Sequence, residues 1–205
     1  MIIERQRKTK DPCPGCALHR SRCVCEFIPS LDLKTRVTLI VHAKELKRTT
    51  NTGALALKGL VNSQMLVRGR DHSPLDLSPE LSDGYRTLLF YPSEDAVELD
   101  HEYVSRSPRP IQLLVPDGNW RQASKVHYRH PELKEIPRVM ISTPNPELNF
   151  LRAENTEHGM ATLQAIALAL GIIEGPKIQS ELMRLYDKKL AGTLSGRGIK
   201  QQEKF

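Results

Sequence analysis

The sequence predicts an α/β domain with a mostly parallel sheet and helices on both of its faces. Three observations lead to this fold class. Short apolar segments rich in β-branched residues alternate with longer segments of helical periodicity, which is the pattern of parallel strands joined by helices. The chain has 205 residues, enough for a domain with its own core. Its composition, 39% hydrophobic and 26% charged, is that of a globular protein.

Five segments are expected to form strands. Residues 37–41 read VTLIV, a continuous apolar run typical of a strand buried on both faces. TLLFY at 87–91 and IQLLV at 111–115 have the same character. Weaker strand candidates are 65–67 and 138–141.

Four segments are expected to form helices. Residues 54–61 follow a run of capping residues, and 118–128 carry apolar side chains at helical spacing. Residues 161–173 are almost entirely apolar. The last helix is expected to begin at Pro176, because proline favours the first helical turn, and its apolar stripe continues to Leu190.

The composition changes along the chain and predicts three parts: a small basic, Cys-rich unit at 1–30, the α/β domain at 31–192 and a flexible tail at 193–205. The basic N-terminus has no apolar segment, so no secretory signal is expected. No run of about 18 apolar residues predicts a membrane span. Thirty Lys and Arg against 24 Asp and Glu give a net charge of +6, which permits a nucleic-acid partner without requiring one.

The Cys-rich unit is a candidate metal site. Its thiols, which are all the cysteines of the chain, are Cys13, Cys16, Cys23 and Cys25. Clustered thiols in a chain with no expected secretory signal indicate metal binding in a reducing cytoplasm rather than disulfides. Four thiolates can surround one tetrahedral Zn²⁺, and Pro14 and Gly15 supply the turn of a zinc knuckle. An iron–sulfur cluster takes the same ligands, and four free thiols are the alternative without metal.

Polar segments follow the predicted strands where parallel sheets bind their ligands, at the carboxyl ends of the strands. After 37–41 comes a run of hydroxyl and amide side chains that ends in glycine: Thr50, Asn51, Thr52 and Gly53. This run suits an anion, although helix capping explains any one of its residues alone. A second polar segment, 151–165, carries Arg152 and passes Gly159 into the apolar helix. The simpler interpretation of this second segment is a loop before a capped helix.

The segment PDGNW at 116–120 follows the strand 111–115 and places the carboxylate of Asp117 at the strand exit. From spacing alone, the simpler interpretation is that Asp117 caps a helix and Trp120 packs in the core. Positive side chains then recur every four residues along the expected helix: Arg121, Lys125 and Arg129. Such a stripe contacts phosphates if the segment belongs to a site, and is otherwise a solvated helix face.

Together these motifs resemble the DTW-domain family, the bacterial tRNA-uridine aminocarboxypropyltransferases. Besides the cysteine knuckle, the stretches that carry the resemblance are TNTG at 50–53, FYPSEDA at 90–96, DGNWRQA at 117–123 and TLQA at 162–165. They span most of the chain, from Cys13 to about Leu170. Asn119 stands where the family usually has Thr, and Gln164 where it usually has Glu.

The resemblance implies a fold similar to the SPOUT methyltransferases, whose parallel sheet ends in a C-terminal trefoil knot. It implies a cytoplasmic enzyme that transfers the 3-amino-3-carboxypropyl group of S-adenosylmethionine to N3 of a tRNA uridine and releases methylthioadenosine. The expected target is the uridine at position 47 of the variable loop. Two alternatives stay open: a related S-adenosylmethionine-dependent RNA methyltransferase, and a zinc-knuckle RNA-binding protein without catalytic activity.

The resemblance and the chemistry assign roles to the candidate residues. Uracil N3 must lose a proton, so Asp117 is the expected base or orienting group, with Asn119 and Trp120 beside it as catalytic candidates. The basic stripe is expected to contact the tRNA, and no membrane and no obligate protein partner are expected. Residues expected to bind S-adenosylmethionine are Thr50, Asn51, Thr52, Gly53, Pro116, Arg152, Gly159 and Thr162.

Overall fold

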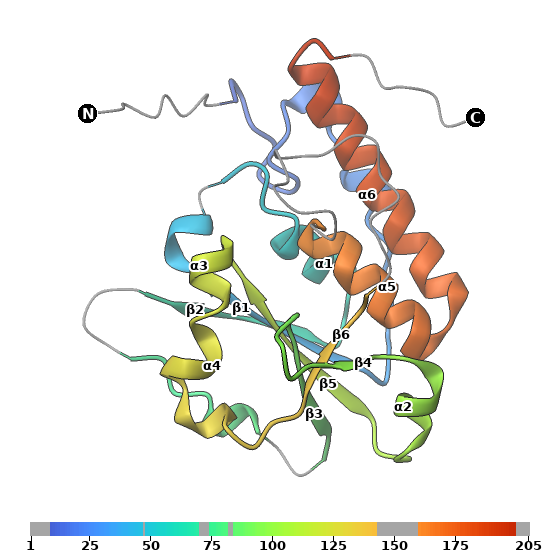
Figure 1. Cartoon of the computed structure of the whole chain (residues 1–205). Helices are drawn as coiled ribbons and strands as arrows, with labels where there is room; N and C mark the ends of the chain where they lie inside the picture. The colour runs from blue at the N-terminus through green and yellow to red at the C-terminus, as the bar shows by residue number, and fades with distance from the viewer. Residues whose placement is uncertain (1–8, 47, 70–73, 82–83, 143–159, 200–205) are drawn as a thin grey trace.

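The computed structural model describes residues 9–46, 48–69, 74–81, 84–142 and 160–199 of the chain. In this part of the chain, six strands form one sheet in the order β2-β1-β5-β3-β6-β4, and neighbouring strands run parallel (Figure 1). The strands are β1 (Arg36–His42), β2 (Ser63–Arg68), β3 (Arg86–Phe90), β4 (Val97–Glu98), β5 (Ile111–Asp117) and β6 (Arg138–Met140). The predicted parallel sheet is therefore confirmed.

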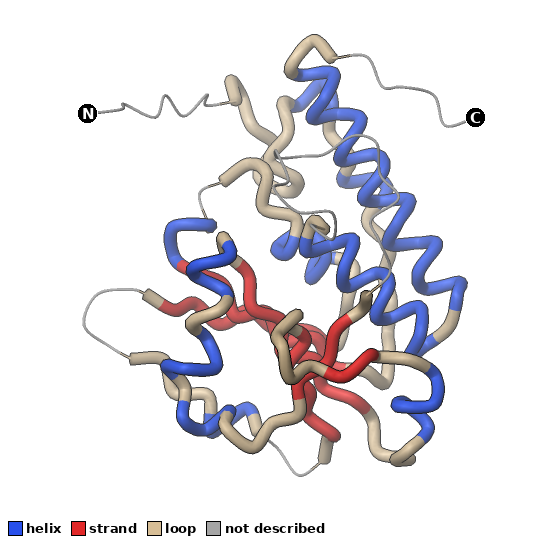
Figure 2. The backbone as a smooth tube through the Cα atoms, in the orientation of Figure 1, coloured by secondary structure: helices blue, strands red, loops and turns tan. Residues whose placement is uncertain are grey.

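Helices cover both faces of the sheet, as predicted (Figure 2). They are α1 (Gly53–Lys58), α2 (His101–Ser105), α3 (Trp120–Ala123), α4 (Val126–Arg129), α5 (Thr162–Glu174) and α6 (Pro176–Gly196). Side chains of α1, α2, α5 and α6 pack with Leu39 and Leu113 in the larger hydrophobic core. Those of α3 and α4 pack with Ile40 and Leu114 on the opposite face. Successive residues of the central strands β1 and β5 thus enter two different cores.

The predicted helix at 118–128 is wrong as a single element, because it is divided into α3 and α4 by a turn at 124–125. The reason is a contact with a side chain of β2. The guanidinium of Arg68, at the end of β2, donates to the backbone carbonyl of Gln122. In a continuous helix that carbonyl would accept from the N–H of Val126, four residues later.

The Cys-rich segment packs directly on α6. Cys16, Leu18 and Val24 are buried in the same hydrophobic core as the residues of α5 and α6. A Cβ atom on Gly192 of α6 would come within 2.8 Å of Leu18 Cδ1, so this glycine permits the close approach. The segment and the sheet therefore share one core.

The C-terminal end differs from the sequence prediction. α6 continues through Gly196, so the tail predicted at 193–205 begins too early. The buried Leu194 explains the longer helix, because it extends the apolar stripe by one more turn. The predicted trefoil knot stays a prediction, because residues 143–159, between β6 and α5, lie outside the described residues. None of the described helices combines the length and the apolar composition that a membrane span requires.

Candidate functional site

The chain topology creates a candidate site at the carboxyl ends of β1 and β5. These two strands are neighbours in the interior of the sheet. The connection that leaves β1 forms α1 on one face, whereas the connection that leaves β5 forms α3 and α4 on the other. Where adjacent strands send their connections to opposite faces, a crevice opens beyond the strand ends, and α/β proteins bind ligands there.

Asp117 lies at this crevice as the last residue of β5, paired in register with Val41 of β1. The residue is 8% exposed, and its Oδ1 accepts a hydrogen bond of 2.6 Å from the hydroxyl of Thr162. Thr162 is the first residue of α5, so the carboxylate faces the N-terminus of a 13-residue helix. The helix dipole stabilises a negative charge at that position. The structure thus brings together Asp117 and Thr162, two residues predicted for the site.

The TNTG run also reaches this crevice, mainly through backbone-directed contacts. Thr52 is 3% exposed, and its Oγ1 accepts from the backbone N–H of Leu163 at 3.2 Å. Asn51 caps α1, because its Oδ1 accepts from the N–H of Ala54 at 3.0 Å. Thr52 therefore ties the start of α1 to the start of α5, and both helix starts lie beside the crevice.

Gly53 lies against the carboxylate of Asp117. A Cβ atom at this position would come within 3.1 Å of Asp117 Oδ2 and 3.0 Å of Leu39 Cδ2. Leu39 is fully buried, so it has little room to give way. The last residue of the TNTG run therefore has to be small for α1 to begin beside Asp117.

Gly53→Ala is expected to lower the free energy of unfolding by about 1–3 kcal/mol, because the added methyl overpacks the contact with Leu39 and Asp117. Gly196→Ala is the matched control, because Gly196 is also helical but its Cβ would meet only Arg22 at an ordinary 3.4 Å. There the alanine is expected to be neutral or stabilising. Urea denaturation of both variants checks this, and equal stability would contradict the close packing at Gly53.

The signature segment after Asp117 forms a capping box. Asn119 Oδ1 accepts from the N–H of Gln122 at 2.9 Å, and Gln122 Oε1 accepts from the N–H of Asn119 at 2.9 Å. Gly118 leaves the space for this exchange, since a Cβ there would come within 2.9 Å of Gln122 Cβ. The Asn119 amide thus holds the start of α3, and Asn in place of the usual Thr preserves a good capping residue.

The structure places the other predicted site residues unevenly. Pro116 precedes Asp117 in β5 and pairs in register with Ile40. The backbone of Trp120 begins α3, while its side chain lies outside what the structure describes. Arg152 and Gly159 also fall outside the described residues. Their expected roles stay predictions.

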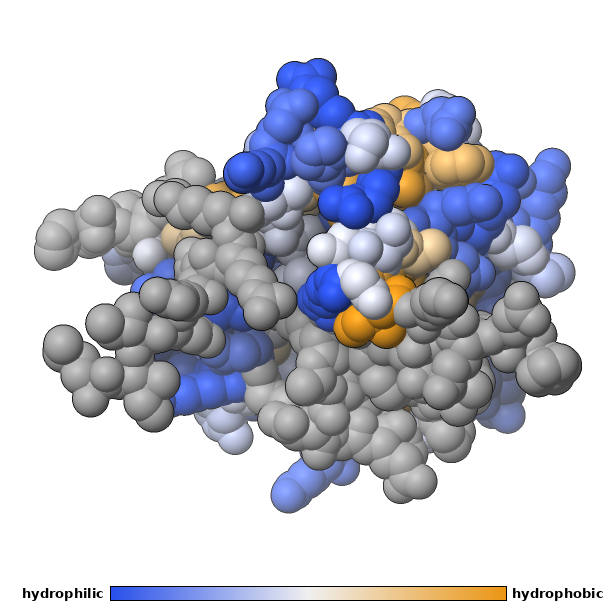
Figure 3. Space-filling model, turned by 90° about the horizontal axis from the view of Figure 1, so that it is seen from above, coloured by the Kyte–Doolittle hydropathy of each residue, from blue (hydrophilic) through white to orange (hydrophobic). Residues whose placement is uncertain are grey.

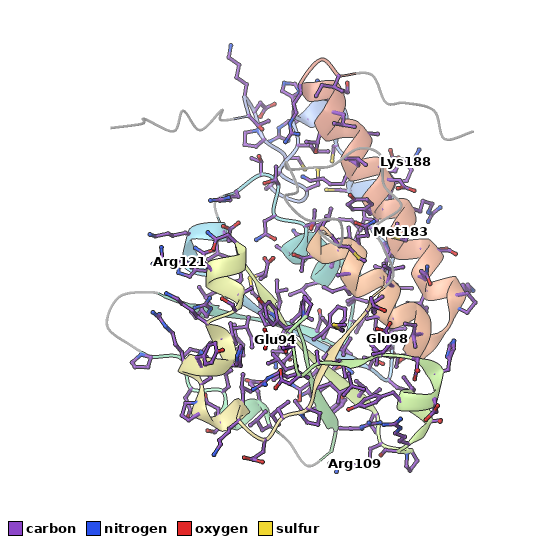
Figure 4. The ribbon with its side chains drawn as sticks, viewed as in Figure 1. Glu94, Glu98, Arg109, Arg121, Met183 and Lys188 are labelled. Atoms are coloured by element: carbon purple, nitrogen blue, oxygen red, sulfur yellow. The ribbon has the colours of Figure 1, made fainter. Side chains whose placement is uncertain are left out.

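The basic stripe does not lie on one continuous helix. Arg121 belongs to α3 and Arg129 to α4, and Lys125 lies in the turn between them. Arg121 and Arg129 are exposed, and Arg121 projects outward from α3 (Figure 4). The three cations still share the segment that follows Asp117.

The sequence assigned no role to two residues of this region, although His42 begins the polar segment that follows the predicted strand 37–41. Arg68 ends β2 and His42 ends β1, and the two pair in register. Burial, together with the positive charges of Arg68, Lys44 and Arg129, lowers the pKa of His42. The signal available was a polar residue directly after each of the predicted strands 37–41 and 65–67.

The cysteine side chains form a compact cluster suited to one metal ion. The Sγ atoms of all four residues lie within 4.8 Å of one another, and Cys13 Sγ is 3.6 Å from Cys25 Sγ and 3.4 Å from Cys23 Sγ. A tetrahedral zinc with Zn–S bonds of about 2.3 Å separates its sulfurs by about 3.8 Å, so the geometry fits. An iron–sulfur cluster places inorganic sulfide between its irons and holds its cysteines farther apart.

The knuckle backbone supports the thiolate form of its first cysteine. Hydrogen bonds from the N–H groups of Cys16 and Gly15 lower the pKa of Cys13 to about 6. Burial raises the pKa of Cys25. A Cβ at Gly15 would collide with Cys25 Sγ, so the tight turn requires glycine. The turn therefore holds the four sulfur atoms close together, and its N–H groups favour the thiolate form that a metal requires.

Lys189 connects the cysteine cluster to the loop beside Asp117. This lysine of α6 is 0% exposed, and its Nζ donates to the carbonyl of Cys16 at 2.5 Å and to that of Thr49 at 2.9 Å. Burial lowers the pKa of Lys189, whereas the nearby cysteine thiols, Cys16 first, favour its charged form. A thiolate cluster with one divalent ion carries net negative charge, which is the counter-charge that a buried ammonium needs.

Known proteins resemble this chain over most of its length. The DTW domain model matches residues 10–193. The chain is 30% identical over 185 residues to tRNA-uridine aminocarboxypropyltransferase 2 of Macaca fascicularis, covering 86% of this chain and 61% of that protein. It is 27% identical over 185 residues to the Drosophila melanogaster protein of the same name, covering 85% and 72%. The SAM-dependent rRNA:acp-transferase Tsr3 from Vulcanisaeta distributa aligns with a TM-score of 0.45 and 17% identity, over 79% of this chain and 80% of that chain.

The matches cover most of this chain but a smaller part of the relatives. The chain spans about three fifths of the length of the macaque relative. The domain model, in contrast, extends from the cysteine cluster through the sheet and Asp117 to α6, which is well over half of this chain. The chain therefore belongs to the DTW-domain family.

Proposed function

We propose that this chain transfers the 3-amino-3-carboxypropyl group of S-adenosylmethionine to N3 of a tRNA uridine. The observation that carries the proposal is the position of Asp117, at the central crevice of the sheet and hydrogen-bonded to the first residue of α5. The names of the relatives support the same reaction. The uridine at position 47 of the variable loop is the proposed acceptor.

The reaction needs a proton acceptor and a donor whose reacting carbon faces N3. In this proposal, the residues of the crevice supply both. The Asp117 carboxylate receives the N3 proton of uracil as N3 bonds to the amino-acid carbon attached to sulfur. The bond between that carbon and sulfur breaks, its electron pair stays on sulfur, and neutral methylthioadenosine leaves. The sulfonium activates each of its three carbons, so the choice of the aminocarboxypropyl group depends on which carbon faces N3.

The donor is proposed to bind between the TNTG run and the start of α5. Gly53 brings the start of α1 close to Asp117, and Thr52 holds the two helix starts together. Backbone N–H groups at a helix start suit the carboxylate of the donor. Pro116 and Thr162 border the same crevice, while Arg152 and Gly159 are assigned to the donor on the family resemblance alone.

The proposed reaction is tested with S-adenosylmethionine labelled either in the aminocarboxypropyl group or in the methyl group. Incubation with tRNA and mass analysis of the nucleosides is expected to show label from the first donor only, on uridine. Methyl label in the tRNA would identify a methyltransferase instead, and tRNA binding without either label would identify a binding protein. A tRNA with cytidine at position 47 is expected to accept nothing if the proposed acceptor is correct.

The basic residues after Asp117 are proposed to contact phosphates of the tRNA. Seen from above, hydrophilic side chains make up much of the described surface, around smaller hydrophobic groups (Figure 3). Tyr128, between these cations in the sequence, is 79% exposed. Exposed aromatic rings next to cations are typical of surfaces that bind nucleic acids, because bases stack on the rings.

Changing Arg121, Lys125 and Arg129 together to Ala is expected to weaken tRNA binding. If each residue neutralises one phosphate, the slope of log K against log salt should flatten by roughly two to three units. Fluorescence titration at several salt concentrations measures the slope, with S-adenosylmethionine affinity as the control that should not change. An unchanged slope would mean that the stripe is only a solvated surface.

A further inference from the structure

A group of basic side chains lies at and beside the carboxyl ends of β1 and β2, next to the proposed active site. Arg68 and His42 end these two strands and pair in register. Arg68 lies two residues after Leu66, and His42 lies two residues after Ile40. Leu66 and Ile40 pack toward α3 and α4, so Arg68 and His42 lie on the same face of the sheet. The group contains Arg68, His42 and Arg129 and is called the strand-end cluster below.

Arg68 is the unusual member of the strand-end cluster. It is only 6% exposed, and its guanidinium donates to the carbonyl of Gln122. Its buried Nε has no hydrogen-bond acceptor, and none of the described carboxylates forms an ion pair with it. A buried charge without a counter-ion is strongly unfavourable, so this position suits an anionic ligand.

The surroundings of Arg68 add positive rather than negative charge. Burial and the charge of Arg129 lower the pKa of Arg68. The pKa of His42 is lowered by burial first, and then by Arg68, Lys44 and Arg129, with Glu45 opposing. Glu45 is itself paired with Arg48, at 3.2 Å between Nε and Oε1. Among the described residues, the charges around the strand-end cluster are therefore mainly positive, which favours an anionic ligand.

The imidazole ring of His42 is held by contacts on two sides. Its Nδ1 accepts a hydrogen bond from the backbone N–H of Lys44 at 3.2 Å. Gly69 has φ of 74°, and a Cβ there would come within 3.0 Å of His42 Nε2. A glycine is thus required both by the backbone conformation and by the approach to the imidazole. The ring is held in place directly beside Arg68.

The position of the cluster favours a phosphate of the RNA over the carboxylate of the donor. In register, Val41 of β1 stands between Val67 of β2 and Asp117 of β5, so Arg68 lies about two strand spacings, roughly 10 Å, from Asp117. Asp117 belongs to the α1 and α5 side through Thr162, whereas Arg68 faces α3. When the base of a nucleotide lies at Asp117, a backbone phosphate of the RNA can reach Arg68 across this distance.

We propose that Arg68, Arg129 and His42 form a binding site for one backbone phosphate of the RNA substrate. The proposal rests on the proposed function, because it places the target base at Asp117. It adds a buried, structurally fixed contact to the exposed stripe. The phosphate anchors the nucleotide chain on the α3 and α4 side of the sheet while the base enters the crevice.

The test compares Arg68→Gln, Arg129→Ala and the control Arg106→Ala in tRNA binding. Arg106 is an exposed arginine that pairs with Glu102 on α2. Each cluster variant is expected to flatten the salt slope by about one unit, whereas the control should leave it unchanged. Arg129 is exposed, so its variant is expected to fold even if Arg68→Gln is unstable.

Inorganic phosphate serves as a second probe, read by NMR of the His42 ring. In the unmodified protein, added phosphate should raise the pKa of His42, because the anion offsets the nearby positive charges. This response should disappear in Arg129→Ala. Unchanged salt slopes in both variants, or loss of S-adenosylmethionine affinity in place of RNA affinity, would overturn the proposal. These readouts need no catalysis, so failure of the transfer assay is distinguished from failure of the phosphate site.

Discussion

Asp117→Asn is expected to lower the single-turnover rate of aminocarboxypropyl transfer by about 10²–10⁴-fold, or roughly 3–5 kcal/mol of barrier. The asparagine amide oxygen can still accept the hydrogen bond that Thr162 donates to Oδ1. The variant keeps the size of the side chain beside Gly53, so folding and donor binding should persist. What disappears is the negative charge that is proposed to take the N3 proton.

The measurement is formation of modified uridine at saturating donor and tRNA. Asp100→Asn is the matched control, since Asp100 caps α2 by accepting from the N–H of Tyr103 at 2.6 Å, away from the crevice. If Asp117 were only a structural residue, both variants would react at similar rates. Circular dichroism and S-adenosylmethionine binding establish that each variant is folded before its rate is compared.

The sequence predicted the sheet well, because β1 and β5 are buried on both faces and their apolar runs show it directly. It also predicted the meeting of Asp117 with the TNTG run, because loops after parallel strands converge at one sheet edge. It did not predict that α3 and α4 are separate. That break depends on Arg68, more than fifty residues earlier in the chain, and no local pattern contains this contact.

Roles at the site were harder to predict than positions. Asn119 lies in the signature segment and is a catalytic candidate, yet its side chain caps α3 together with Gln122. Lys189 is recognisable from the sequence pattern of the last helix. It falls on the apolar stripe of α6 next to Leu190, and a charged residue on such a stripe needs a buried partner. The partners, Cys16 and Thr49, come from segments that only the tertiary structure brings together.

Loss of the metal is expected to destabilise the whole domain, and not only the N-terminal segment. The proposed ion is zinc, at about one per chain, held by the four cysteines. Cys16→Ser should remove it, because a closed tetrahedral site depends on all of its ligands. Cys16, Leu18 and Val24 pack in the main core, so a disordered knuckle would expose part of that core. Lys189 would lose its acceptor at Cys16 and the negative charge of the cluster. A loss of about 3 kcal/mol or more follows, which lowers Tm by roughly 6–12 °C.

Elemental analysis and thermal unfolding of the purified protein test this expectation, with and without a strong chelator. Val24→Ala is the control, since it removes core packing from the same segment but keeps all four sulfurs. The chelator should lower the Tm of the unmodified protein and of Val24→Ala, and leave Cys16→Ser unchanged. Lys189→Met should hold zinc less tightly, because the buried counter-charge is gone. Iron in place of zinc would correct the identity of the metal, and a folded protein without metal whose Tm ignores the chelator would refute the site.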